Sequence, residues 1–71
     1  MQNLTLIVIP GPGARTVSVN PNTTVEQLVT QENLHGRDII VNGAGIQPAN
    51  YQTSVIPNNA EVFATGSVKG N

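Results

Sequence analysis

The chain begins with two short runs in which apolar and polar residues alternate, the pattern of a β-strand with one buried face. In residues 4–9 every even-numbered position is apolar, and Ile7 and Ile9 make the far end apolar on both faces. Residues 10–13 read Pro-Gly-Pro-Gly, which interrupts a strand and favours a tight turn. Residues 15–19 alternate again, with two valines on one face. The pattern therefore predicts an N-terminal β-hairpin.

A helix is predicted after a second interruption at residues 20–22. Thr23 is followed three residues later by Glu26, the spacing of a capping box in which Thr23 caps the helix and Glu26 reaches back to it. We expect the helix to end near Glu32 or Asn33. Its apolar face follows from the i, i+3, i+4 spacing of Val25, Leu28 and Val29.

The second half of the chain predicts further strands separated by turns. Asn42-Gly43 favours a two-residue turn, and residues 57–60 (PNNA) favour another. Val62 and Ala64 share one face of the last strand, which places Phe63 on the opposite face. The expected elements are a strand at Asp38–Val41, a loop with at most one helical turn at residues 44–50, a short edge strand at residues 51–56, and a last strand at residues 61–68.

This order of elements indicates an α+β fold. Two strands precede the helix and at least two follow it, so we expect a mixed sheet of four to five strands with the helix packed on one face. The first and last strands can lie side by side in parallel at the centre of such a sheet. The chain has 71 residues and no internal repeat, and we expect it to form a single domain, residues 1–71.

Charged residues are sparse, and this narrows the possible partners. They make up 10% of the chain, against about 25% in a typical soluble domain. Three dispersed bases are too few for phosphate-driven binding of nucleic acid or for a basic membrane patch. A surface rich in amides and hydroxyls favours a subunit of an assembly over a freely diffusing protein. The acids are Glu26, Glu32, Asp38 and Glu61, and the bases are Arg15, Arg37 and Lys69.

Residue types that support catalysis or metal binding are scarce. The chain has no cysteine and one histidine, His35, so we expect neither a thiolate site nor a histidine metal cluster. His35 has no nucleophile motif beside it, and we expect Asp38 and Glu61 to be solvated carboxylates rather than a catalytic pair. The prediction is a protein that is not an enzyme and needs no cofactor. Because the sequence shows neither a signal peptide nor a membrane span, we expect a cytoplasmic or virion-associated protein.

Three segments follow one another in the order of a helix start, a strand end and a turn: residues 23–29 (TTVEQLV), 40–43 (IVNG) and 57–62 (PNNAEV). Together they resemble the ubiquitin-like β-grasp superfamily, most closely its ThiS/MoaD sulfur-carrier branch. The resemblance spans almost the whole chain and implies the β-grasp fold. In that branch an E1-like adenylating enzyme activates the C-terminal glycine, which is then thiocarboxylated.

The end of the chain departs from that family. Carriers end in Gly-Gly, whereas this chain ends in Lys69-Gly70-Asn71. Asn71 would put an amide side chain where the family's reacting carboxylate lies, and removal of Asn71 would leave Gly70 without a second glycine. A sulfur carrier activated by an E1-like adenylating enzyme, with Gly70 or Asn71 as its acyl-carrying end, is therefore an alternative hypothesis.

The favoured hypothesis is a protein–protein interaction module or a small assembly subunit, such as a phage virion or accessory protein. Phe63 is expected on the sheet face away from the helix, near Ile7, Ile9 and Ile40, either in an exposed apolar patch or packed beneath a loop. An apolar patch on an exposed sheet face is typical of protein contacts. These four residues are the candidate interface. A small inhibitor that binds through the same face is a further alternative.

Overall fold

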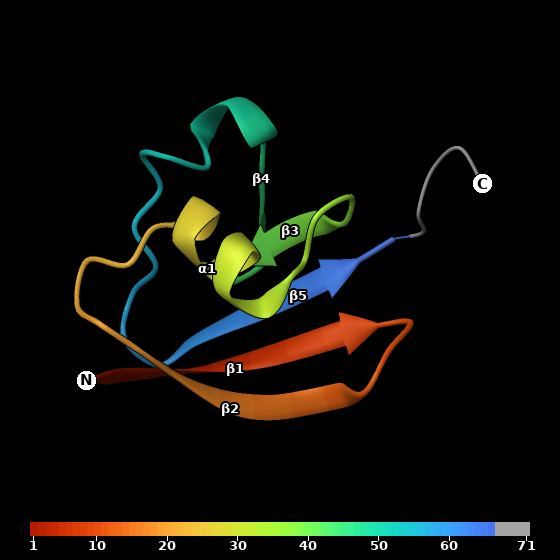
Figure 1. Cartoon of the computed structure of the whole chain (residues 1–71), viewed down its shortest axis with the longest axis horizontal. Coiled ribbons are helices and arrows are strands. Elements are labelled where there is room, and N and C mark those ends of the chain that lie inside the picture. The colour runs from red at the N-terminus through yellow and green to blue at the C-terminus, as the bar shows by residue number, and fades with distance from the viewer. Residues whose placement is uncertain (67–71) are drawn as a thin grey trace.

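The computed structural model describes residues 1–66, which form one mixed sheet of five strands with one α-helix on one face (Figure 1). The strand order is β2-β1-β5-β3-β4; β1 and β5 run parallel, and the other neighbours are antiparallel. The expected α+β class and the parallel pairing of the first and last strands are confirmed. The elements are β1 (Gln2–Ile9), β2 (Gly13–Val19), α1 (Val25–Glu32), β3 (Asp38–Val41), β4 (Ala44–Ile46), the 3-10 helix η1 (Pro48–Asn50) and β5 (Ala60–Thr65).

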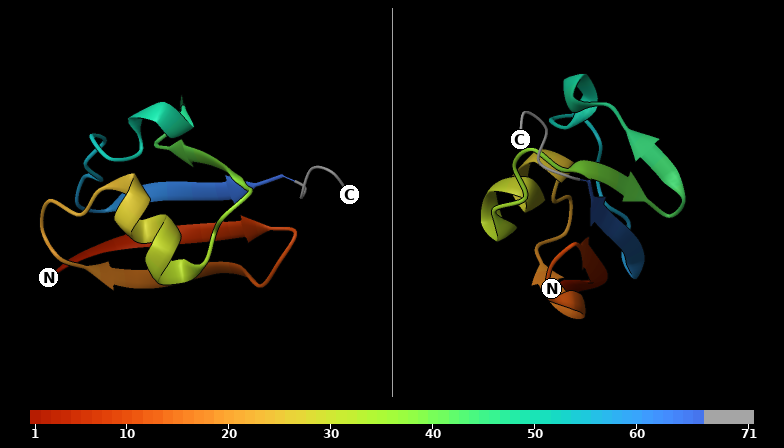
Figure 2. Two further views of the ribbon diagram at one scale, coloured as in Figure 1. Left: turned by 45° about the horizontal axis from the view of Figure 1, so that its top comes forward. Right: turned by 90° about the vertical axis from the view of Figure 1, so that its right-hand side faces the viewer.

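The hydrophobic core lies between the sheet and α1. Figure 2 shows α1 on one side of the sheet only. Burial alternates along β1, β3 and β5 as the sequence predicts, so these strands turn one set of side chains toward α1 and the other set away from it. The buried residues facing α1 include Leu4, Leu6, Val8, Ile39, Val41, Ala60, Val62 and Ala64, all at most 8% exposed, and α1 adds Val25, Leu28 and Val29.

The helix begins one residue later than the sequence predicts. Thr24 is its N-cap: Thr24 Oγ1 accepts a hydrogen bond from Gln27 N at 3.2 Å, and Gln27 Oε1 accepts one from Thr24 N at 2.9 Å. Both Thr23 with Glu26 and Thr24 with Gln27 have the spacing of a capping box, but the Thr23 hydroxyl is bound elsewhere. Thr23 is buried, and its Oγ1 donates to the Asn20 carbonyl at 2.6 Å. The predicted box of Thr23 with Glu26 was therefore wrong.

The predicted end of the helix is confirmed. α1 ends at Glu32, and Asn33 caps it in the left-handed conformation with φ of 58°. Asparagine tolerates that conformation better than most residues. The chain then returns to the core at once, because Leu34 is 3% exposed.

The edge strand predicted at residues 51–56 is wrong. The edge strand is β4, in a segment that the sequence assigned to a loop. Asn42 and Gly43 adopt φ of 51° and 86°, the conformation of a two-residue hairpin turn. The chain therefore reverses immediately after β3, and Ala44 pairs with Val41.

Residues 51–56, here called the strap, form an irregular connection that is tied to the start of α1. The first N–H groups of a helix have no partner within the helix, and the strap supplies carbonyls to two of them. Ile56 anchors the strap in the core at 2% exposure. The backbone hydrogen bonds run from Val25 N to Ser54 O (2.8 Å), from Glu26 N to Tyr51 O (3.0 Å) and from Ile56 N to Thr23 O (2.8 Å).

Gly11→Ala tests the close approach in the turn between β1 and β2. A Cβ at Gly11 would lie 2.7 Å from Cγ1 of the buried Val8, whose stiff side chain would have to shift. We expect the free energy of unfolding to fall by about 1–3 kcal/mol. Gly45→Ala is the matched control, because a Cβ there meets nothing within 4 Å. Urea unfolding of both variants measures the difference, and equal losses would contradict the close approach.

Candidate functional site

The face of the sheet opposite α1, here called the open face, carries a line of apolar residues across all five strands. Ile7 of β1 pairs in register with Phe63 of β5, and Phe63 pairs with Ile40 of β3. Ala14 of β2 pairs with Ile7 at one end, and Gly45 of β4 pairs with Ile40 at the other. Residues paired across neighbouring strands point to the same face. We call these five residues the apolar row.

Three of the four predicted interface residues belong to the apolar row, and the fourth, Ile9, lies two positions farther along β1 on the same face. Ile9 is 50% exposed, and the other three are partly buried. The ends of the row, Ala14 and Gly45, were not predicted. The signal for Gly45 was the Asn42-Gly43 turn, because a two-residue turn determines which β4 residue faces Ile40.

Polar residues flank the apolar row on both sides. Their side chains carry hydroxyl or carboxylate groups that can bond to a partner at the margin of an apolar contact. An apolar centre with a polar margin is the usual arrangement of a protein interface. The flanking residues by register are Thr16, Thr5 and Glu61 on one side, and Thr65 on the other.

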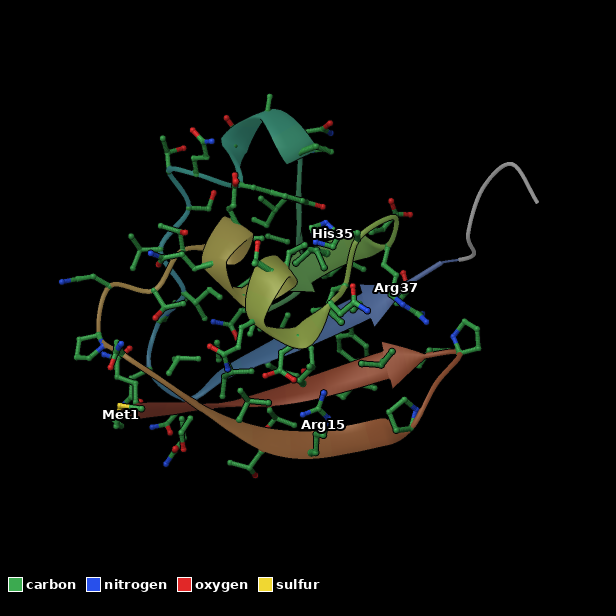
Figure 3. All side chains as sticks on the ribbon, viewed as in Figure 1. Met1, Arg15, His35 and Arg37 are labelled. Atoms are coloured by element: carbon green, nitrogen blue, oxygen red, sulfur yellow. The ribbon has the colours of Figure 1, made fainter. Side chains whose placement is uncertain are left out.

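The arginines of the described residues lie away from the apolar row. Figure 3 shows Arg15 extending from β2 toward α1, where its Nη2 lies 2.7 Å from Glu32 Oε1. The pKa of Glu32 is lowered, chiefly because the Gln31 side-chain amide donates to the carboxylate, and Arg15 adds to the effect against the opposing influence of burial. Arg37 lines a groove beside α1. The open face therefore presents the carboxylate of Glu61 but no arginine.

The groove, of about 430 Å³, lies between α1, residues 34–38 and the segment that contains Pro48 and Tyr51. Burial raises the pKa of Tyr51, and the negative charge of Asp38 raises it further, so the phenol is protonated at neutral pH. Within residues 1–66, no side-chain hydrogen bond joins His35, Asp38 or Tyr51, and Arg37 Nη1 is buried without a partner. The groove thus holds titratable groups without the hydrogen-bonded geometry of an acid–base pair. Its lining includes Glu26, Val29, Leu34, His35, Arg37, Asp38 and Tyr51.

The two carboxylates considered as a catalytic pair lie in different places. Asp38 lines the groove, whereas Glu61 is exposed on β5 and is not part of the groove lining. In the described part of the chain, no group of three or more His, Asp or Glu side chains is placed to hold a metal ion. Among those same residues, no helix has the length and apolar character needed to cross a membrane.

The candidate acyl-carrying end, Gly70 and Asn71, lies outside the described residues. β5 ends at Thr65, so the strand predicted at residues 61–68 is shorter than expected, and Gly66 follows with φ of 101°. Residues 67 and 68 of that prediction also lie outside the described range.

The architecture of residues 1–66 agrees with the resemblance to the sulfur-carrier branch, because it is a mixed five-stranded sheet with one α-helix on one face. No protein-family model matches the chain, and no match is found among the curated proteins or the solved structures.

Proposed function

We propose that this chain is a β-grasp protein that acts without catalysis, by binding another protein through the open face of its sheet. Two features support the β-grasp assignment: the parallel pairing of β1 with β5 inside a mixed sheet, and the position of α1, the one α-helix of residues 1–66, across one face (Figure 2). The hairpin, the helix and the later strands follow one another in the order that the resemblance to the β-grasp superfamily implies.

The observation that carries the proposal is the difference between the two faces of the sheet. On the helix side, Leu6 and Val62 are fully buried. On the open face, Ile7 and Phe63 follow them in sequence, yet no described segment covers that face (Figure 2). Phe63 occupies the middle of the apolar row, where an aromatic side chain can act as the anchor of an interface.

The low charge of the chain favours a place in an assembly. Net charge is −1 and charged residues make up 10%, so little electrostatic repulsion keeps this surface away from other proteins. A small subunit of a larger assembly, such as a phage virion or accessory component, fits that composition. An inhibitor that covers its target with the same face would use the same residues.

The test is native isolation of the full chain with the proteins that copurify with it. We expect a stoichiometric complex with a defined partner. Phe63→Ser and Ile40→Ser should each weaken binding to that partner by about 30-fold, because loss of a central anchor typically costs about 2 kcal/mol or more. Titration of purified partner with each variant, by calorimetry or interferometry, measures the loss.

Val55→Ser is the matched control for this experiment. Val55 is also an exposed apolar residue, at 52%, but it lies in the strap beside Thr24 and not on the open face. It should bind as tightly as the natural sequence does. Unchanged binding in the Phe63 and Ile40 variants would refute the proposal. An isolated chain that ends at Gly70 in a thiocarboxylate would favour the sulfur-carrier alternative instead.

A further inference from the structure

The two edges of the sheet differ in length. β4 forms one edge with three residues, and β2 forms the other with seven. Within residues 1–66, β2 pairs with β1 alone, and no described segment lies beyond it in Figures 1 and 2. The outward N–H and C=O groups of β2 therefore offer a row of free hydrogen-bonding positions to another strand.

β2 lacks the features that usually prevent such pairing. It contains neither proline nor lysine, and it pairs with β1 without a bulge, from Gln2 with Val19 to Val8 with Gly13. Arg15 is the one charged residue of β2, and it does not hinder pairing at this edge because it is directed toward α1 and bound to Glu32 (Figure 3).

We infer that a second copy of this chain pairs with β2 in the antiparallel direction and joins two sheets into one. A twofold axis perpendicular to the sheet reverses the strand and keeps both helices on the same side. With the axis at Thr16, each Thr16 faces its equivalent, Ala14 faces the second copy's Ser18, and Arg15 faces the second copy's Val17. Paired residues share a face, and no like charges meet.

A second copy suits this edge better than a charged partner does. Because the net charge is only −1, electrostatic repulsion between two copies is small. On the open-face side of β2, Thr16 meets its equivalent and Ala14 meets the second copy's Ser18, and these side chains are small enough to do so without steric conflict. The seven residues of β2 are fewer than the roughly 20–30 residues a side of a standard interface, so we expect a weak dimer that depends on concentration.

Thr16→Cys tests the arrangement directly, because the chain has no other thiol. In the dimer the two copies of residue 16 lie opposite each other with Cα atoms about 4.5–5.5 Å apart, a separation that a disulfide can bridge. In oxidised glutathione, the full-length variant should form a linked dimer about tenfold faster than Thr53→Cys, an exposed control in the strap, because pairing raises the local thiol concentration.

Sedimentation equilibrium provides a second, independent measurement. The natural sequence should show a reversible monomer–dimer equilibrium that Thr16→Lys weakens by about threefold or more, because like charges then face each other. Phe63→Ser should leave the dimer unchanged. Equal cross-linking of the two cysteine variants, or a natural sequence that stays monomeric, would overturn the inference. Loss of the dimer in Phe63→Ser would also overturn it and would assign self-association to the open face.

Discussion

Replacement of Leu6 by alanine is expected to lower the free energy of unfolding by about 2–5 kcal/mol. Leu6 is 0% exposed and lies in β1, between Arg15 of β2 and Val62 of β5. Truncation removes buried methyl groups and leaves a cavity that flanking strands cannot easily close. A chain of this length has a total stability of about 4–10 kcal/mol, so the loss is a large fraction of it. Urea unfolding followed by circular dichroism measures the change.

Ile7→Ala is the control for this prediction, because Ile7 is the next residue of the same strand but faces the open side. It is partly buried, and its removal should cost less than about half as much as the Leu6 change. Similar losses at both positions would mean that the two faces of β1 are equally enclosed, which contradicts the arrangement described above.

Ile56→Ala is expected to cost about 2–4 kcal/mol, although Ile56 lies outside any helix or strand. Its side chain is 2% exposed, and its backbone N–H donates to Thr23 O at 2.8 Å. Loss of the side chain removes the anchor that holds the strap against the first turn of α1. We therefore expect both the core and the helix N-terminus to be weakened. Thermal and urea unfolding report the total loss, and hydrogen exchange at Val25 and Glu26 reports the local one.

Val55→Ala is the matched control for Ile56→Ala. Val55 precedes Ile56 and is 52% exposed, so its truncation should change the free energy of unfolding by less than about 0.5 kcal/mol. A loss at Val55 as large as that at Ile56 would contradict the anchoring role of the buried isoleucine.

Local sequence patterns predicted most of the helices and strands. The predictions were wrong where two patterns fitted the same segment or where the pattern was weak. Alternation placed Leu6 and Ile7 on opposite faces correctly. The capping-box pattern fits both Thr23 and Thr24, and the choice depends on contacts with Asn20 and the strap, which are not visible in the local pattern. The strand β4 was missed because Ala and Gly have weak strand preference, so pairing with β3 decides its conformation.

The sequence predicted part of the candidate site in the same way. Alternation was enough to place Phe63 on the open face, but its neighbours Ile7 and Ile40 depend on register between strands that are far apart in sequence. The groove beside α1 gave no local signal at all. Its lining comes from α1, residues 34–38, Pro48 and Tyr51, which are separate segments of the sequence.

The parallel pairing of β1 with β5 sets the order in which the protein can form during synthesis. Leu4 pairs with Ala60, and Ile9 pairs with Thr65, so β1 pairs with the strand that is translated last among the five described ones. Until that segment leaves the ribosome, the apolar residues of β1 lack the strand that flanks them on one side. Such non-local pairing slows folding. The nascent hairpin and helix therefore stay incompletely packed until residues 60–65 have been synthesised.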